Sequence, residues 1–279
     1  MQSILRYPGG KTRKTVKQRI LAVSPKDFAE YREPFVGGGG IFFSIQPNKK
    51  RWINDKDDHL ISVYQALKTR PDEFIKKCLE IRQHSKKEEV PPPIYNERLR
   101  NKFLELAFDE ECDQALRYFF VNRTVWAGRV NYSIKSRLYF SNPTGWNITT
   151  SGKLEKAAKI LQDAKITSQD YATLLSEPGD NVFIYCDPPY LLNSKLANNS
   201  KLYRHNFTIE DHEKLADAVK ACKHRVCLSY DDDEFIRNLY KDFNIHRFEM
   251  TYCGTSSAES DASRNNKKRK GAELLICNY

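Results

Sequence analysis

Short apolar runs recur along the chain, and polar or glycine-containing segments separate them. The run at residues 182–186 contains two β-branched residues and is followed shortly by Pro188 and Pro189. A continuous apolar run of this length is typical of a strand that is buried on both faces. Proline cannot donate a hydrogen bond to a sheet, so this strand is expected to end at or before Asp187.

Apolar periods typical of strands and of helices alternate along most of the chain, which favours an α/β protein. Asp57 and the pair Thr208 and Asp211 have the residue types that cap helix N-termini. A helix is also expected to begin at Ile41, after four glycines. Other strands are predicted near residues 31–36, 51–55, 165–167, 225–229, 245–252 and 273–278, and helices near residues 14–21, 57–67, 154–161 and 208–222.

This alternation stops at residues 69–71 and resumes at Lys153. Residues 71–121 are charged and mostly of helical period, with a connector of three prolines at residues 91–93. We therefore predict one domain formed by residues 1–68 and 152–279. A mainly helical domain of residues 69–151 is inserted into it.

The composition narrows the classes of function. The 279 residues are 40% hydrophobic and 29% charged, and the formal net charge is +10, which favours a polyanionic partner. No apolar stretch has membrane-spanning length and no signal-peptide pattern is present, so no membrane association is expected. Seven cysteines without a C-x-x-C pair indicate reduced intracellular thiols, and the absence of a zinc motif predicts no metal.

Four consecutive glycines, residues 37–40, follow the strand predicted near residues 31–36. Glycine allows the backbone to turn sharply and to approach a ligand closely. The next predicted strand ends in Asp55, and an acid at this place in dinucleotide-binding folds hydrogen-bonds ribose hydroxyls. Each feature alone has an ordinary structural explanation, but their order along the chain favours a nucleotide-type site.

The stretch Asp187-Pro188-Pro189-Tyr190 resembles the catalytic motif of the amino-methyltransferases, which methylate exocyclic amines of nucleic-acid bases with S-adenosylmethionine. Adenine N6 is a poor nucleophile because its lone pair is delocalised into the ring. Asp187 and the carbonyl of Pro188 can accept hydrogen bonds from the amine and favour the charge that develops on it. Tyr190 offers a ring on which a flipped base can stack. Taken alone, the tetrapeptide is also explained as a strand followed by a stiff loop.

Arginine, asparagine and aromatic residues are interleaved between residues 122 and 146, without a clear helical period. Arginine can contact phosphates or guanine edges, and aromatic rings can stack on displaced bases. An ordinary loop with a partly buried aromatic cluster explains the segment equally well. The basic loop at residues 263–270 could be a nuclear-import signal, but phosphate contact fits the rest of the chain better. The residues predicted to contact DNA are Asn122, Arg123, Trp126, Arg129, Lys267, Lys268 and Arg269.

Motifs at residues 7–11, 33–39, 54–55, 122–123 and 187–190 occur in the order found in the DNA adenine N6-methyltransferases of the D12 class, and resemble its alpha group. The likeness extends over nearly the whole chain. It implies an α/β, Rossmann-like S-adenosylmethionine-dependent methyltransferase sheet with an inserted target-recognition domain. Two mild departures are Tyr7, where the family often has Trp, and Gly40, where Ser or Ala is common. The resemblance implies a cofactor site formed by Tyr7, Lys11, Phe35, Gly37, Gly39, Asp55, Asp170, Tyr171 and Asp187.

The sequence therefore predicts a site-specific methyltransferase that uses S-adenosylmethionine to methylate adenine N6 in double-stranded DNA by base flipping. Its expected location is the cytoplasm of a prokaryote or of a phage-infected cell. Alternatives are cytosine N4 methylation, an RNA substrate, and a DNA-binding module with a decayed active site. The recognition sequence, the oligomeric state and a cognate restriction endonuclease stay open. The predicted catalytic residues are Asp187, Pro188, Pro189 and Tyr190.

Overall fold

Seven strands form one sheet in the order β3-β2-β1-β4-β5-β7-β6. Strands β1 to β5 are parallel to one another, whereas β7 runs antiparallel to both β5 and β6. The computed structural model describes residues 3–7, 9–11, 14–45, 49–83, 101, 105, 112–125, 130, 152–191, 207–252 and 269–279. The strands are β1 (Glu30–Glu33), β2 (Lys50–Asn54), β3 (Ala164–Thr167), β4 (Val182–Cys186), β5 (Arg225–Asp231), β6 (Asn244–Tyr252) and β7 (Arg269–Cys277).

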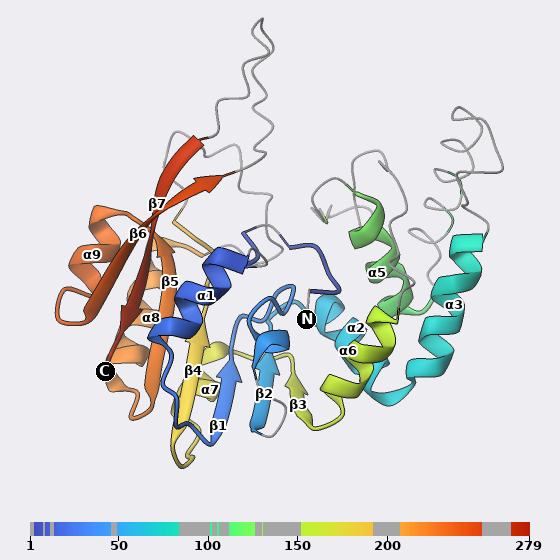
Figure 1. Ribbon diagram of the computed structural model, residues 1–279, viewed down its shortest axis with the longest axis horizontal. Coiled ribbons are helices and arrows are strands. Elements are labelled where there is room, and N and C mark those ends of the chain that lie inside the picture. The colour runs from blue at the N-terminus through green and yellow to red at the C-terminus, as the bar shows by residue number, and fades with distance from the viewer. Residues whose placement is uncertain are drawn as a thin grey trace, which may run out of the picture.

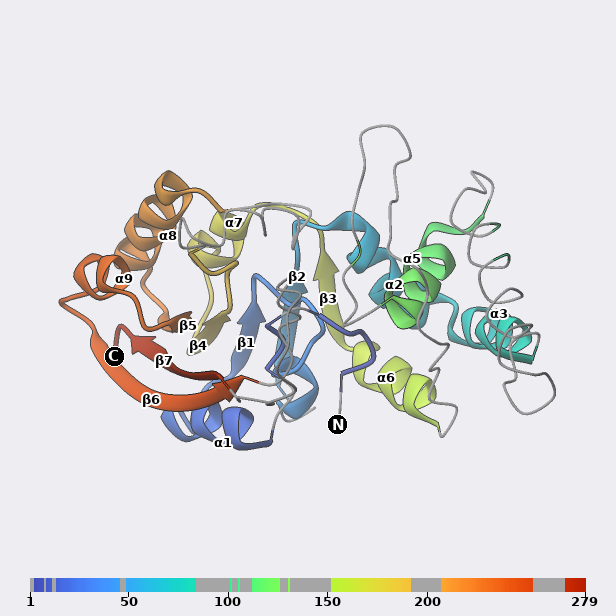
Figure 2. The same cartoon turned by 90° about the horizontal axis from the view of Figure 1, so that it is seen from above.

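Helices lie on both faces of the sheet, with α1 on one face and α7, α8 and α9 on the other (Figures 1 and 2). The predicted caps are confirmed: Asp57 accepts from two amides at the start of α2, and Thr208 and Asp211 form a capping box on α8. The helices are α1 (Lys14–Val23), α2 (Asp58–Thr69), α3 (Pro71–Gln83), α5 (Gln114–Thr124), α6 (Lys153–Leu161), α7 (Tyr171–Ser176), α8 (Ile209–Ala221) and α9 (Glu234–Leu239).

Successive side chains of the central strands enter two different hydrophobic clusters. In β4, Phe183 and Tyr185 belong to the cluster that contains Ile20 of α1, whereas Val182 and Ile184 pack with Leu215 of α8. This alternation follows from the two-residue period of a strand whose two faces are both covered by helices. The prediction that this strand is buried on both faces and ends before Asp187 is confirmed.

One predicted element is wrong. The residues after the four glycines form only a 3-10 turn, Phe42–Ser44 (η1), and Ile45 is already extended. Pro47 follows two positions later in the sequence, and the residue before a proline is biased away from helical backbone angles. The apolar pattern of residues 41–43 therefore marks burial rather than an α-helix: Ile41, Phe42 and Phe43 are all buried.

Helices α3 and α5 are the elements that the structure describes within residues 69–151. Both contact α2, and both add apolar side chains to the cluster that contains Ile53 of β2. Most of residues 84–151 lie outside the described part of the chain, so the inserted recognition domain stays a prediction. Among the described helices, none has the length and apolar content needed to cross a membrane.

A candidate active site at the carboxyl edge of the sheet

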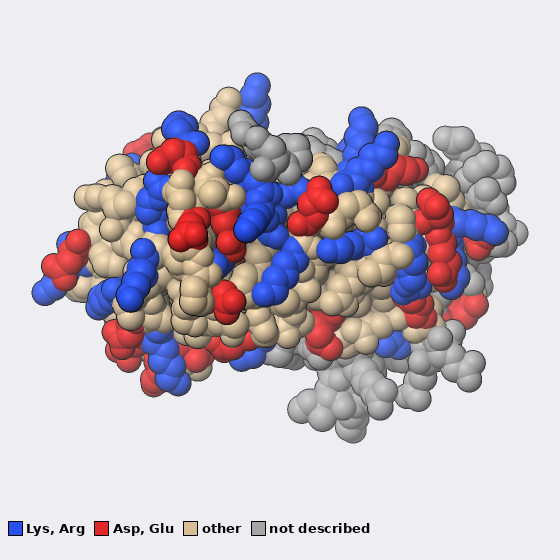
Figure 3. All heavy atoms as spheres, turned by 90° about the horizontal axis from the view of Figure 1, so that it is seen from below, with Lys and Arg blue, Asp and Glu red and all other residues tan. Residues whose placement is uncertain are grey.

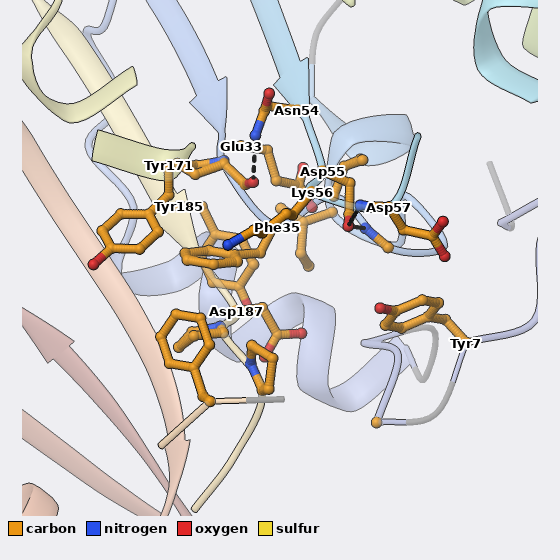
Figure 4. Close-up of a pocket in the computed structure, with 18 of the residues that line it drawn as sticks. Tyr7, Glu33, Phe35, Asn54, Asp55, Lys56, Asp57, Tyr171, Tyr185 and Asp187 are labelled. Carbon is orange, nitrogen blue, oxygen red and sulfur yellow. Dashed lines mark hydrogen bonds between the residues drawn. The ribbon is translucent and has the colours of Figure 1, made fainter. Parts of the chain in front are cut away.

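A cavity of about 440 Å³ opens at the carboxyl ends of β1, β2 and β4. Strand β1 is followed in sequence by β2 on one side, and β4 lies on its other side, so the cavity is at the topological switch point. Its volume is within the range of small-molecule sites. In Figure 4, Tyr7 and Tyr171 lie at opposite ends of the lining side chains, with Phe35 and Asp187 between them.

The glycine turn brings backbone close to the N-terminal segment. Gly37 has φ +45°, and a Cβ atom there would lie 2.9 Å from the ring of Tyr7. A Cβ atom on Gly40 would lie 3.0 Å from the backbone oxygen of Lys11. Side chains at either position would displace a wall of the cavity, which explains why this sequence has glycine there.

Asn54 joins the ends of three neighbouring segments. Its Nδ2 donates to the carbonyls of Pro34 and Gln169, and its Oδ1 accepts from the Thr167 hydroxyl and the Gln169 amide, all within 3.1 Å. All four hydrogen-bonding positions of this buried amide are therefore used. The result is a rigid edge from which Asp55 projects.

The Asp55 carboxylate is held by backbone amides. Its Oδ2 accepts from Gly37 N at 2.9 Å and its Oδ1 accepts from Asp57 N at 3.0 Å. Burial raises its pKa to about 7, although these two amides act in the opposite direction. A ribose contact by Asp55 stays a prediction.

Glu33, at the end of β1, also lines the cavity and is buried. Its Oε2 accepts a hydrogen bond of 2.7 Å from the Tyr31 hydroxyl. Burial raises its pKa to about 8, and the nearby charge of Asp187 adds to the shift. Within the described residues, neither Glu33 nor Asp55 forms an ion pair, and their raised pKa values favour the protonated forms of both side chains near neutral pH.

Asp187 directly follows β4 and has two partners on one oxygen. Lys11 Nζ donates to its Oδ1 at 2.8 Å, and the Ser229 hydroxyl donates to the same atom at 2.7 Å. Ser229 is in turn hydrogen-bonded to the Tyr185 hydroxyl at 2.8 Å. The other oxygen, Oδ2, has no hydrogen-bond partner among the described residues. Asp187 thus combines a fixed orientation with one free acceptor atom at the cavity.

Lys11 is a buried cation shared by two acids. Its Nζ lies 2.8 Å from Asp187 and 3.2 Å from Glu273, and it also donates to the Tyr190 hydroxyl and to Gly9 O. Burial alone would lower its pKa, but the charges of Asp187 and Glu273 raise it above its ordinary value. The ammonium group therefore stays charged, in contrast to an isolated buried lysine. In this structure its donors are directed at side chains of the site.

Three aromatic rings form the other end of the site. Phe35 lies 5.4 Å from Tyr171 and 5.7 Å from Phe207 between ring centroids, and Tyr171 and Phe207 are 6.0 Å apart. All three line the cavity. Asp170 caps α7 by accepting from Ala172 N, which fixes the position of Tyr171 at the first residue of that helix. This end of the cavity can accommodate a flat, apolar ring.

The structure brings most of the predicted cofactor and catalytic residues together. Gly39 has φ +70° within the turn and is the one member that does not line the cavity. The predicted residues that line it are Tyr7, Lys11, Phe35, Gly37, Asp55, Asp170, Tyr171, Asp187, Pro188, Pro189 and Tyr190.

The residues predicted to contact DNA have a different outcome. Asn122 is fully buried, donates to Arg6 O at 2.7 Å and accepts from Arg6 N at 2.9 Å. Arg123 is 9% exposed and donates to Ile4 O, and burial lowers its pKa to about 10. In this geometry both side chains hold the N-terminal segment and present almost no surface to DNA. Trp126, Arg129, Lys267 and Lys268 lie outside the described residues, and for Arg269 only its place at the start of β7 is described.

Among the residues of the site that were not predicted are Glu33, Phe207, Ser229 and Glu273. Glu33 is within a quoted motif, and its position at the end of a strand was a usable signal. Glu273 was also detectable, because it is the one charged residue in the apolar stretch at residues 271–277. Ser229 and Phe207 have no local signal, since only the folded sheet brings them beside Asp187 and Tyr171.

The seven-stranded sheet, the glycine turn and the acid-proline edge define a Rossmann-like methyltransferase fold. Residues 7–252 match the family described as D12 class N6 adenine-specific DNA methyltransferase. The chain therefore belongs to this family, whose members are adenine-specific DNA methyltransferases.

Relatives extend over the full length of the chain. A Type II methyltransferase of Lactococcus lactis subsp. cremoris is 27% identical over 100% of this chain and 96% of its own length. A Type II methyltransferase of Methanocaldococcus jannaschii is 27% identical over 100% of this chain and 99% of its own. A DNA adenine methylase of Vibrio cholerae is 28% identical over 99% of this chain and 95% of its own length.

Proposed function

We propose that this adenine-specific methyltransferase binds S-adenosylmethionine in the cavity and methylates N6 of an adenine that is flipped out of double-stranded DNA. The observation that carries the proposal is the geometry of Asp187. One of its oxygens is fixed by Lys11 and Ser229, and the other is free at the cavity. The Asp187 carboxylate already has its ion-pair partner in Lys11, so its free oxygen is available to accept a hydrogen bond from an amine.

The cavity fits the proposed cofactor in charge and in shape. The methyl donor, when bound, supplies a methyl group on a positively charged sulfonium and carries an ammonium group. Glu33 and Asp55 are buried acids that form no ion pair among the described residues, and a cationic ligand would favour their ionised forms. The rings of Phe35, Tyr171 and Phe207 suit an adenine ring.

Asp187 activates the target amine by accepting a hydrogen bond from one N–H at Oδ2, while the carbonyl of Pro188 accepts a hydrogen bond from the other N–H. These two hydrogen bonds favour the lone pair that attacks and the positive charge that develops on nitrogen. Alignment of the amine contributes more than basicity, because the reaction is a direct displacement. The proton that the methylated amine loses passes to Asp187.

Base flipping is supported by the position of Asp187. An amine within a stacked base pair cannot reach an acceptor inside a cavity, so enzymes that act on such atoms extrude the base. Tyr190 is hydrogen-bonded through its hydroxyl to Glu273 at 2.7 Å, so its ring has a fixed place beside Asp187. We assign it the role of contacting the flipped base.

DNA is proposed to approach the carboxyl edge of the sheet. Helix α5 leads directly into Trp126 and Arg129, and β7 begins with Arg269 directly after Lys267 and Lys268. On the opposite face, at the amino ends of the parallel strands, basic and acidic side chains are interspersed (Figure 3). Such a mixed surface is a poorer polyanion site than a basic one. We propose a cytoplasmic, DNA-associated enzyme of a prokaryote or phage, for which a restriction endonuclease is a candidate partner.

The test is to incubate the protein with labelled S-adenosylmethionine and unmethylated genomic DNA and to analyse the digested nucleosides by mass spectrometry. We expect N6-methyladenine, and modification-sensitive sequencing of the intact DNA should place it at one recurring motif. N4-methylcytosine would contradict the assigned base. Labelled RNA in a parallel reaction, without label in DNA, would contradict the assigned substrate.

A further inference from the structure

Glu273 lies in a strand whose next four residues, Leu274 to Cys277, are all apolar and buried. It is itself only 2% exposed. Strand β7 runs antiparallel to β5, so its first half reaches the carboxyl edge of the sheet, where Glu273 lies opposite Asp231 in the strand register. A buried charge is unfavourable without an opposite charge or hydrogen bonds. The side chains that contact the Glu273 carboxylate therefore indicate what this residue does.

Both partners of Glu273 flank Asp187. Its Oε1 accepts from the Tyr190 hydroxyl at 2.7 Å and lies 3.2 Å from Lys11 Nζ. Lys11 is also the ion-pair partner of Asp187, and Tyr190 is the last residue of the Asp-Pro-Pro-Tyr motif. Glu273 neither lines the cavity nor bonds to Asp187. It therefore contacts the groups around the proposed acceptor without contacting a substrate.

We propose that Glu273 is a positioning residue for methyl transfer, which acts through Lys11 and Tyr190 to keep Oδ2 of Asp187 directed at the cavity. This inference rests on the proposed function. Lysine has a flexible four-carbon stem, so a second carboxylate is needed to fix where its ammonium group lies. A displacement of about 1 Å in a reacting group can slow a reaction roughly 100-fold.

The contacts of Glu273 argue against a purely structural role. Its Oε2 is buried and has no hydrogen-bond partner among the described residues. A buried carboxyl with one unsatisfied oxygen is a poor source of stability. A glutamine could still accept the Tyr190 hydrogen bond and would not bury a charge. The fold alone therefore does not require glutamate at this position, whereas the orientation of Lys11 does.

The experiment compares Glu273→Gln with Glu249→Gln, which makes the same change at an exposed site on the neighbouring strand β6. Single-turnover methyl transfer is measured at saturating cofactor and DNA, together with cofactor affinity and the thermal midpoint. We expect a loss of about 10- to 100-fold for Glu273→Gln, with the other two quantities unchanged or improved. Glu249→Gln should match the wild type in all three.

A double-mutant cycle tests whether Glu273 acts through its neighbour. The combined Tyr190→Phe and Glu273→Gln enzyme should lose little more rate than the slower single variant, because each change alone already frees the Lys11 ammonium group from its fixed position. Losses that multiply would overturn the inference. A Glu273→Gln enzyme whose single-turnover rate stays within about twofold of the wild type would also overturn the inference. A twofold change is far smaller than the loss of rate that a displaced reacting group causes.

A second readout does not depend on methyl transfer. Loss of one neighbouring negative charge lowers the pKa of Lys11, so an amine-reactive label should modify Lys11 several-fold faster in Glu273→Gln, as peptide mass mapping would show. Unchanged labelling would overturn the inference even if the rate falls. A wild-type protein that methylates no DNA would contradict the proposed function, and the labelling result would still decide whether Glu273 holds Lys11.

Discussion

Two pairs of acids in and beside the cavity differ in their counter-charge. Asp187 and Glu273 share the Lys11 ammonium group, whereas Glu33 and Asp55 form no ion pair within the described residues. The pKa of Lys11 is therefore raised by its partners, and burial raises the pKa values of Glu33 and Asp55 to about 8 and about 7.

This difference separates a pre-organised region from one that is completed by a ligand. Around Lys11 one ammonium group is shared by two carboxylates, and the hydrogen bonds fix each group before any substrate arrives. Glu33 and Asp55 tend to stay protonated in the free protein, and a bound cation would favour the loss of these protons. One pair suits the chemistry of an amine, and the other suits the binding of a positively charged cofactor.

The largest effect is expected from removing the free acceptor. Asp187→Ala should lower single-turnover methyl transfer by at least about 10³-fold, since it removes the group proposed to stabilise the developing charge. Binding of duplex DNA, measured by gel shift, should change little. A variant with near-normal turnover would show that Asp187 does not have this role.

Removing the shared cation tests the pre-organised region itself. Lys11→Met leaves the buried Glu273 and the half-buried Asp187 without their ion-pair partner, which should lower the free energy of unfolding by up to about 3–5 kcal/mol. Denaturant titration measures this change, and methyl transfer should slow as well. Lys220→Met, at an exposed site on α8, is the matched control. Equal stability of the two variants would mean that the ion pairs around Lys11 contribute little.

The other pair predicts a dependence of stability on pH. In the folded protein Glu33 has a pKa of about 8, above its ordinary value of 4.5, so the folded state holds a proton that the unfolded state releases. The free energy of unfolding therefore falls as pH rises from about 4.5 to about 8, by up to about 1.4 kcal/mol for each pKa unit.

Glu33→Gln should remove the contribution of Glu33 to this fall in the free energy of unfolding with pH. The variant should therefore be more stable than the wild type at pH 8. Denaturant titrations at pH 5.5 and pH 8 measure the slope. Asp55, with a pKa of about 7, keeps a smaller slope in the variant. Parallel slopes in the two proteins would contradict the raised pKa of Glu33.

The smallest effect is expected at a residue outside both pairs. Thr208→Ala removes the capping hydrogen bond on α8 and should destabilise the protein by about 1 kcal/mol. Thermal unfolding measures this change. The single-turnover rate at saturating cofactor should match the wild type, because Thr208 does not line the cavity. A slower rate would indicate that the position of α8 contributes to the chemistry.

The parts of the fold that were predictable have local causes. The apolar run of β4 and the caps of α2 and α8 depend on neighbouring residues, and the structure confirms them. The structure also brings most of the motif residues to one cavity. Parallel strands explain this, because their carboxyl ends meet at the same edge.

Other features depend on contacts between distant segments. Asn122 was predicted at a DNA surface from its neighbours in sequence, but it forms two hydrogen bonds with Arg6, 116 positions away. Glu273 contacts Tyr190 across 83 positions. No local pattern of residues indicates either pairing. The helix predicted after the glycines is wrong because burial of residues 41–43 was interpreted as helical periodicity.

The most direct test of the account compares Asp187→Asn with Glu33→Gln in one pair of assays: calorimetric binding of S-adenosylmethionine, and single-turnover methylation of DNA at saturating cofactor. We predict that Asp187→Asn binds the cofactor nearly as the wild type does and transfers almost no methyl group. Glu33→Gln should bind the cofactor more weakly and, once saturated, transfer it at close to the wild-type rate. The same pattern of loss in both variants would contradict the division of the cavity into two regions.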